Sequence, residues 1–181
     1  NLFINDKDVE DEMICSKQLL EQYKNTVDRS SIVSKADFKG NITYVNEAFC
    51  KISGYKEEEL IGKPHNIVRH PDMDSSVFKE MWHTIKDLKQ LWSGNVKNRK
   101  KDGNFYWVQT IINPILDENG NILEFIGIRT DITEIEKTKE YLKDQYDISQ
   151  NNFQEVMNLS KLYENAIEES NIILRLNTNK I

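Results

Sequence analysis

The sequence predicts an α+β fold with a five-stranded antiparallel sheet, short helices on one face, an N-terminal helix and a long C-terminal helix. Two observations predict the sheet: β-branched and aromatic residues gather in five short segments, and Asp, Gly and Asn fill several of the turns between them. A third predicts the last helix, because residues 134–170 contain many Glu, Lys and Gln but neither Gly nor Pro.

The first half of the chain carries turn and capping residues at the ends of its elements. Residues 37–41 have the composition of a hairpin turn. Asn46 is expected to cap a short helix that ends at Gly54. The expected elements are a helix over residues 13–27, strands over Ile32–Ala36 and Ile42–Val45, and short helices over Glu47–Ser53 and 56–61.

The second half begins with a longer helix and continues with three strands. Apolar residues at helical spacing predict the helix, and Asp74 or Ser75 can cap it. Residues 101–104 and 117–121 have the composition of turns. The expected elements are a helix over residues 74–88 and strands over Trp92–Arg99, Phe105–Ile115 and Ile122–Ile132.

Composition limits the classes of function. The 181 residues carry a formal net charge of −6 without a long basic stripe, which argues against nucleic acid and against direct membrane contact. No apolar stretch approaches the roughly 18 residues of a membrane span. With only two cysteines, a cytoplasmic location is expected. The sequence lacks a hydrolase triad motif, a Gly-rich phosphate loop and a Cys/His metal spacing, so we expect no enzyme in this piece.

The order of elements and five motifs resemble a PAS domain over about residues 29–133. The resemblance implies a ligand cavity between the sheet and its helices, and an exit from the last strand into a signalling helix. The motifs are Ile42–Phe49, Gly54–Tyr55, Glu59–Pro64, Lys101–Gly103 and Gly127–Thr133.

A second set of motifs resembles the flavin-binding PAS domains of bacterial aerotaxis receptors. It implies a redox or oxygen sensor that binds FAD without a covalent bond and signals through the C-terminal helix. The output domain of the parent protein, such as a chemoreceptor, histidine kinase or nucleotide cyclase, stays open. The motifs are Asn66–Met73, Met81–Trp82, Trp92–Gly94 and Lys97–Arg99.

The resemblance and the strand pattern give one set of candidate cofactor-binding residues. Several have a plain structural alternative: a helix cap for Asn46, core packing for Trp82, and a local loop network for the Arg69, His70 and Asp72 group. The candidates are Asn46, Arg69, His70, Asp72, Trp82, Trp92, Asn98 and Arg129.

Strand alternation predicts which side chains face the cavity. If Asn98 points inward, so do Trp92, Gly94 and Val96 on the same strand. The following strand then places its alternate residues inward, and these are Tyr106, Val108, Thr110 and Ile112.

Three positions differ from the light-sensing LOV branch of the PAS family. Asn98 matches a flavin-binding Asn of that branch, but Val108 stands where LOV has a second Asn. The segment 62–69 lacks the reactive cysteine, and Cys50 lies elsewhere, so no cysteinyl-flavin photocycle is expected. Arg129 replaces a signalling Gln, and its cation would favour a reduced, anionic flavin. The alternative is a surface arginine paired with Asp131 or Glu134.

Other ligands remain open. Heme is an alternative cofactor, because heme-binding PAS domains use a His near the position of His83. That residue follows Trp82 and therefore points about 100° away from it on a helix. Two further alternatives are a sensor of a small metabolite and a ligand-free module used only for dimerisation and relay.

The expected partner is a second copy of the chain. Phe105, Trp107 and Ile111 fall on the outer face of the sheet, where an exposed apolar patch needs a cover. We expect a homodimer in which residues 13–27 cover that face. An imperfect heptad in the C-terminal helix favours a parallel dimer over packing on its own domain. Its members are Ile135, Leu142, Tyr146, Phe153, Val156, Tyr163 and Ile167.

The end of the chain resembles its beginning. Residues 163–173 match 23–33 in character, which predicts the start of a truncated second PAS repeat. The predicted parts are therefore a tail and capping helix over residues 1–28, the PAS sensor domain over 29–133, a signalling helix or coiled-coil linker over 134–170, and the second repeat from 171 to 181.

Overall fold

The computed structural model describes residues 6–178 and consists of two compact units, one up to Thr133 and one from Glu134 onward. The second unit is almost entirely helix. In order, the elements of the chain are α1 (Asp6–Ser30), β1 (Ile32–Ala36), β2 (Ile42–Val45), α2 (Glu47–Ser53), α3 (Glu57–Leu60), η1 (His65–Val68), α4 (Ser75–Trp82), η2 (His83–Asp87), β3 (Trp92–Arg99), β4 (Phe105–Leu116), β5 (Ile122–Asp131) and α5 (Thr133–Thr178).

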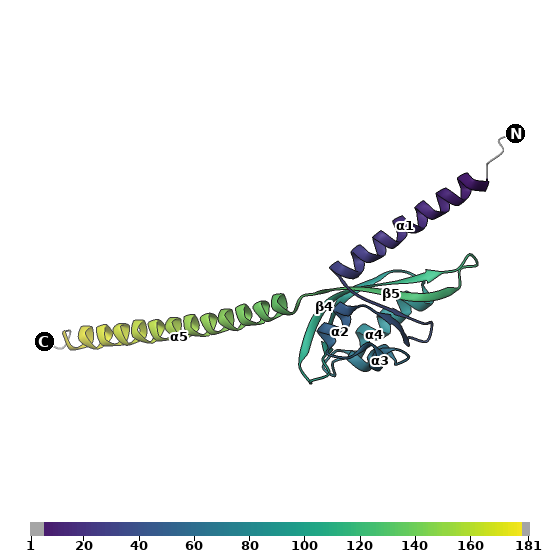
Figure 1. Ribbon diagram of the computed structural model, residues 1–181. Coiled ribbons are helices and arrows are strands. Elements are labelled where there is room, and N and C mark those ends of the chain that lie inside the picture. The colour runs from purple at the N-terminus through teal and green to yellow at the C-terminus, as the bar shows by residue number, and fades with distance from the viewer. Residues whose placement is uncertain (1–5, 179–181) are drawn as a thin grey trace. The chain divides into compact units, whose positions relative to one another are not determined.

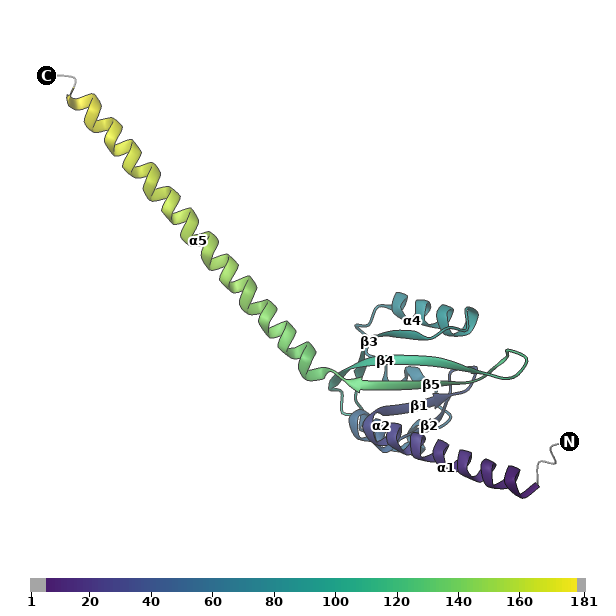
Figure 2. The same cartoon turned by 90° about the horizontal axis from the view of Figure 1, so that it is seen from above.

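The five strands form one antiparallel sheet in the order β2-β1-β5-β4-β3, which Figure 2 shows from above. The last strand of the chain, β5, therefore lies in the middle and pairs with both β1 and β4. The helices α2, α3 and α4 lie on one face of the sheet (Figure 1). The predicted α+β fold is confirmed.

Local capping explains where these helices and turns lie. The side chain of Asn46 accepts a hydrogen bond from the backbone N–H of Phe49, and Gly54 ends α2 in the left-handed conformation. Asp74 caps α4 in the same way through Ser76 N–H. In the β1–β2 turn, the Asp37 carboxylate accepts from the backbone of Lys39 and Asn41 and thereby closes the hairpin.

The core fills the space between the inner face of the sheet and its helices. Its residues come from the alternate, inward positions of the strands and from the apolar faces of the helices. The most deeply buried large side chains are Ile42, Phe49, Leu60, Val68, Ile85, Tyr106 and Val108.

Three elements differ from the predicted ones. The first helix begins at Asp6 instead of residue 13. The predicted helix over 74–88 is α-helical only to Trp82 and continues as a π-helical turn, η2. The short 3₁₀ helix η1 was not predicted, because four polar and apolar residues after Pro64 carry no helical period.

The C-terminal helix α5 extends through residues 171–178, where the second repeat would form its first strand. A lone strand has no sheet to pair with, so a helix there is expected whether or not a repeat follows. The second repeat therefore stays a prediction, and its last residues, 179–181, lie outside the described part. No helix among the described residues is long and apolar enough to cross a membrane.

Within the single chain described, the predicted cover of the outer sheet face is not formed by α1. Its C-terminal end contacts β2 and α2, where the Asp28 carboxylate accepts from Tyr44 Oη at 2.9 Å. Ile111 on the outer face of the sheet stays 42% exposed. The large apolar residues along α1 are exposed as well, and they include Met13, Ile14, Leu19, Leu20 and Tyr23.

Candidate functional site

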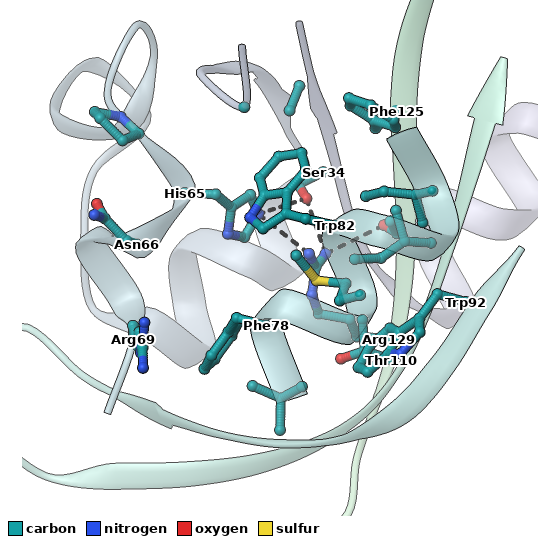
Figure 3. Close-up of a pocket in the computed structure, with 18 of the residues that line it drawn as sticks. Ser34, His65, Asn66, Arg69, Phe78, Trp82, Trp92, Thr110, Phe125 and Arg129 are labelled. Atoms are coloured by element: carbon teal, nitrogen blue, oxygen red, sulfur yellow. Dashed lines mark hydrogen bonds between the residues drawn. The ribbon is translucent and has the colours of Figure 1, made fainter. Parts of the chain in front are cut away.

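A cavity of about 390 Å³ lies between the inner face of the sheet and the segment from η1 to η2 (Figure 3). Cavities of ~300–1,000 Å³ are the usual size of small-molecule sites. Five of the predicted cofactor-binding residues line it: Arg69, Trp82, Trp92, Asn98 and Arg129.

The strand alternation predicted from the sequence is confirmed. On β3, Trp92, Val96 and Asn98 are buried while their neighbours are more exposed. On β4, Thr110 and Ile112 line the cavity. The Trp92 ring lies over Gly94, where an added Cβ would come within 2.6 Å of the ring.

Arg129 is a buried cation on the central strand β5. It is 5% exposed and its guanidinium donates to Ser34 Oγ at 2.9 Å and to the Gly127 carbonyl at 3.2 Å. It forms no ion pair with Asp131 or with any other carboxylate among residues 9–170, and its side chain is buried, so the alternative of a surface pair is wrong. Burial lowers the pKa of Arg129 to about 10, which leaves the group charged at neutral pH.

The small size of Gly127 allows this position. The Arg129 side chain folds back along β5, and a Cβ on Gly127 would lie 2.8 Å from Nη2 and 2.9 Å from Nη1. The guanidinium therefore lies against Gly127, and a side chain at position 127 would displace it.

His65 is a site residue that the sequence analysis missed. Its Nε2 lies 3.1 Å from Arg129 Nη2 and 3.0 Å from Ser34 Oγ (Figure 3). Because a guanidinium can only donate, Nε2 carries no proton and the neutral ring is protonated on Nδ1. Burial, followed by the nearby Arg129 charge, lowers the pKa of His65 to about 3.

Arg69 follows η1 and lines the cavity. Its guanidinium lies 4.1 Å from the centre of the Phe78 ring and donates to the Met73 carbonyl at 3.3 Å. Its backbone forms an isolated β-bridge with Asn98, which fixes the segment after η1 to strand β3.

His70 and Asp72 do not line the cavity. The Nδ1 atom of His70 accepts from the backbone N–H of Asp72 at 3.2 Å, and the ring packs edge-on against Phe105. The Asp72 carboxylate is 69% exposed and lies 3.4 Å from Lys97 Nζ. The alternative of a local loop network therefore accounts for His70 and Asp72.

Asn46 also lies outside the cavity lining, because its side chain connects four backbone groups. It accepts from Val33 N and Phe49 N and donates to the carbonyls of Asp28 and Ser31. The helix-cap alternative therefore accounts for Asn46.

Trp82 lines the cavity from α4 and packs edge-on against Phe125 at 5.7 Å between ring centres. His83, the candidate heme ligand, points away. Its Nδ1 lies 3.0 Å from the Asp87 carboxylate at the surface, outside the cavity lining. In this position, His83 cannot serve as the axial ligand of a heme in the cavity.

One polar group in the cavity wall has no partner in the described chain. The Thr110 hydroxyl is buried and makes no hydrogen bond. Such groups are rare in folded proteins, since each leaves a desolvated donor and acceptor unsatisfied. Thr110 and Arg129 are thus two polar groups in the cavity wall that could contact a bound molecule.

Sequence comparison agrees with this fold. Residues 42–129 match the family described as the PAS fold, and the chain contains a PAS domain. It is a sensor module related to the aerotaxis receptor of Escherichia coli K12, with which it shares 44% identity over 109 residues, 60% of this chain and 21% of the receptor. The chain spans about a fifth of the length of the curated relatives it matches.

Solved structures agree as well. The PAS domain of a Colwellia psychrerythraea protein is 26% identical with a TM-score of 0.58, and the match covers 64% of this chain and 98% of that one. A light-oxygen-voltage domain studied with a flavin analogue has a TM-score of 0.58 over 72% of this chain and 95% of its own. At 20% identity, that second likeness supports the fold alone.

Proposed function

We propose that this PAS module is a redox or oxygen sensor that binds FAD non-covalently in the cavity and passes its state to α5. The observation that carries the proposal is Arg129, a buried cation that pairs with no carboxylate among residues 9–170 and faces a cavity with aromatic walls. The relation to an aerotaxis receptor agrees with a sensing role.

The donors and walls of the cavity fit a flavin ring. Trp92, Val96 and Ile112 offer flat and apolar surface for a planar ring. Thr110, Asn98 and Arg129 offer a hydroxyl, an amide and a guanidinium for its polar edge. The unpartnered Thr110 hydroxyl gains a hydrogen bond when such an edge is present.

A bound flavin supplies reversible electron transfer. Arg129 stabilises negative charge placed in the cavity, and low local polarity strengthens that interaction. His65 and Ser34 hold the guanidinium in place with contacts of 3.1 Å and 2.9 Å.

The path to α5 is short. Arg129 lies on β5, which ends at Asp131, and α5 begins at Thr133. At this junction Ile132 N–H donates to the Trp107 carbonyl at 2.9 Å, and Trp107 N–H donates to Thr133 Oγ1 at 3.0 Å. A shift of Arg129 along β5 therefore acts on the hydrogen bonds that fix the start of α5.

The test is the absorption spectrum of freshly purified protein, with and without added FAD, before and after anaerobic reduction. The proposal expects a two-band yellow spectrum that bleaches on reduction. A Soret band would identify the cofactor as heme instead of a flavin. A colourless protein that ignores FAD would reject the proposal and leave a metabolite sensor or a relay module.

A further inference from the structure

His65 lies in the cavity wall where η1 meets other elements of the domain. Its Nε2 atom lies 3.0 Å from Ser34 Oγ on β1 and 3.1 Å from Arg129 Nη2 on β5. The Phe49 ring of α2 packs edge-on against it, with 5.7 Å between the ring centres. The imidazole is thus held by protein on these sides while it also lines the cavity.

The hydrogen bonds around Nε2 depend on its protonation state. The neutral ring accepts from Arg129 Nη2, and Arg129 Nη1 donates to Ser34 Oγ at 2.9 Å. A proton on Nε2 would point at the Nη2–H group, where two donors cannot form a hydrogen bond. Protonation of His65 therefore exchanges the bond from Arg129 for one that Nε2–H donates to Ser34 Oγ.

The charged side chains that line the cavity are all positive. In the described part of the chain no Asp or Glu lines it, whereas Lys39, Arg69 and Arg129 do. Arg129 is the cation next to His65, and its charge adds to burial in lowering the pKa of the ring to about 3. Without an anion in the cavity, His65 therefore stays neutral.

The other neighbours of His65 carry no charge. From β1 and α2 the ring meets Ser34 and Phe49. Burial raises the pKa of Tyr106 on β4 to about 12, so that phenol stays neutral as well. No neighbouring carboxylate competes for the proton, and a negative charge in the cavity would act directly on His65.

We propose that His65 is the proton acceptor of this sensor: when negative charge enters the cavity, Nε2 takes a proton from water and releases Arg129 Nη2. The inference rests on the proposed flavin function, in which two electrons from an external donor and one proton from water leave one negative charge in the cavity. A further proton forms the N–H bond at Nε2, and the hydrogen bond from Arg129 breaks. Acid therefore makes the cofactor easier to reduce.

The strength of the interaction sets the pH range of this coupling. An opposite charge within about 4–6 Å shifts a pKa by about one to three units. His65 then takes its proton at roughly pH 4–6 when the cavity holds negative charge, and near pH 3 when it does not. The coupling is therefore largest near pH 5 and absent at pH 7.5.

The test is the midpoint potential of the FAD-loaded protein between pH 4.5 and pH 7.5, with a reduced viologen as electron donor. Each proton taken up with two electrons contributes about 30 mV per pH unit to the slope. His65→Asn keeps an acceptor for Arg129 but does not titrate. Near pH 5 the wild-type slope should exceed that of His65→Asn by about 15 mV per pH unit, which corresponds to half a proton. The exposed His83→Gln should keep the wild-type slope.

Nitrogen NMR of the imidazole rings gives a second measurement, on the wild-type ring itself. The chain has three histidines, so His70→Gln and His83→Gln assign the signals of the other two. At pH 5 the His65 ring should be neutral in the oxidised protein, with its proton on Nδ1, and should shift toward the imidazolium form on reduction. This result does not depend on whether His65→Asn retains the flavin.

The outcomes separate the inference from the proposed function. If FAD binds and is reduced but the His65 ring stays neutral at pH 5, or if wild type and His65→Asn have equal slopes, His65 is not the proton acceptor while the flavin sensor stands. If the wild-type protein binds no flavin, both proposals are overturned.

Discussion

The Nη2 atom of Arg129 lies 3.1 Å from Nε2 of His65, although the two residues are 64 positions apart in the sequence. A cation and a titratable ring thus share the wall of one cavity. Burial lowers the pKa of His65 most, and the adjacent Arg129 charge lowers it further, so the ring is neutral at neutral pH.

This neutral His65 predicts a loss of stability in acid. Its pKa is about 3 in the folded state and 6.5 in the unfolded chain, so the unfolded state binds the proton first. Above pH 6.5 this effect on the free energy of unfolding is absent, and the free energy of unfolding falls as the pH drops from 6.5 toward 3. At pH 5 the cost is about 2 kcal/mol. Urea unfolding at pH 7 and pH 5 measures it.

Substitution isolates the contribution of His65. Because an Asn side chain keeps an acceptor for Arg129 but does not titrate, His65→Asn should remove about 2 kcal/mol of the difference between pH 7 and pH 5. The exposed His83→Gln serves as the control and should keep the wild-type difference. An unchanged pH dependence in His65→Asn would show that the ring is not held neutral.

Loss of the Arg129 charge should make the bound flavin harder to reduce. Arg129→Gln removes the cation that stabilises negative charge in the cavity, so the midpoint potential should fall by roughly 30–60 mV. Gly127→Ala keeps the charge but displaces the guanidinium, which an added Cβ would approach at 2.8 Å. It should lower the potential in the same direction.

Spectroelectrochemical titration measures these potentials. Arg99→Gln removes an exposed arginine from β3 and should leave the potential unchanged. A wild-type potential in both Arg129→Gln and Gly127→Ala would remove Arg129 from the redox response.

The buried Thr110 hydroxyl predicts opposite effects on stability and on binding. Thr110→Val removes a hydroxyl without a partner and keeps the side-chain shape, so the apoprotein should gain about 1 kcal/mol of stability. The same change should weaken flavin binding severalfold. Thr110→Ser keeps the hydroxyl and should retain the affinity. If Thr110→Val left the affinity intact, the hydroxyl would have no role toward the ligand.

The sequence predicted the local features of this fold closely. The bounds of β1, β2, α2 and β3 agree with the predicted ranges, because each element has its own periodicity and its own capping or turn residues. Alternation along β3 and β4 also gave the inward faces correctly, since a strand has a period of two.

The polar wall of the cavity depends on long-range pairing that no local pattern encodes. Ser34, His65 and Arg129 come from β1, η1 and β5, and a single serine or histidine carries no periodic signal. The family motif placed Arg69, His70 and Asp72 together, but a turn after η1 separates them, so only Arg69 reaches the cavity.

The exposed apolar residues of α5 predict self-association. Leu142, Val156 and Tyr163 recur at intervals of seven or fourteen, and each is more than half exposed in the single chain. Such a stripe is typical of a coiled coil, and a 46-residue helix gains stability from burying it. We propose a parallel homodimer through α5, in which α1 of the two copies covers the outer sheet faces.

Sedimentation velocity tests this assembly. Val156→Lys places a charge in the proposed seam and should raise the dimer dissociation constant by at least about tenfold. Gln154→Lys adds the same lysine two positions away, on a different side of the helix, and should leave the constant near wild type. Trp107→Lys tests the sheet contact separately, since it places a charge on the outer face of β4. A wild-type chain that stays monomeric at high micromolar concentration would contradict the dimer, and equal effects of the two α5 variants would place the contact outside the heptad stripe.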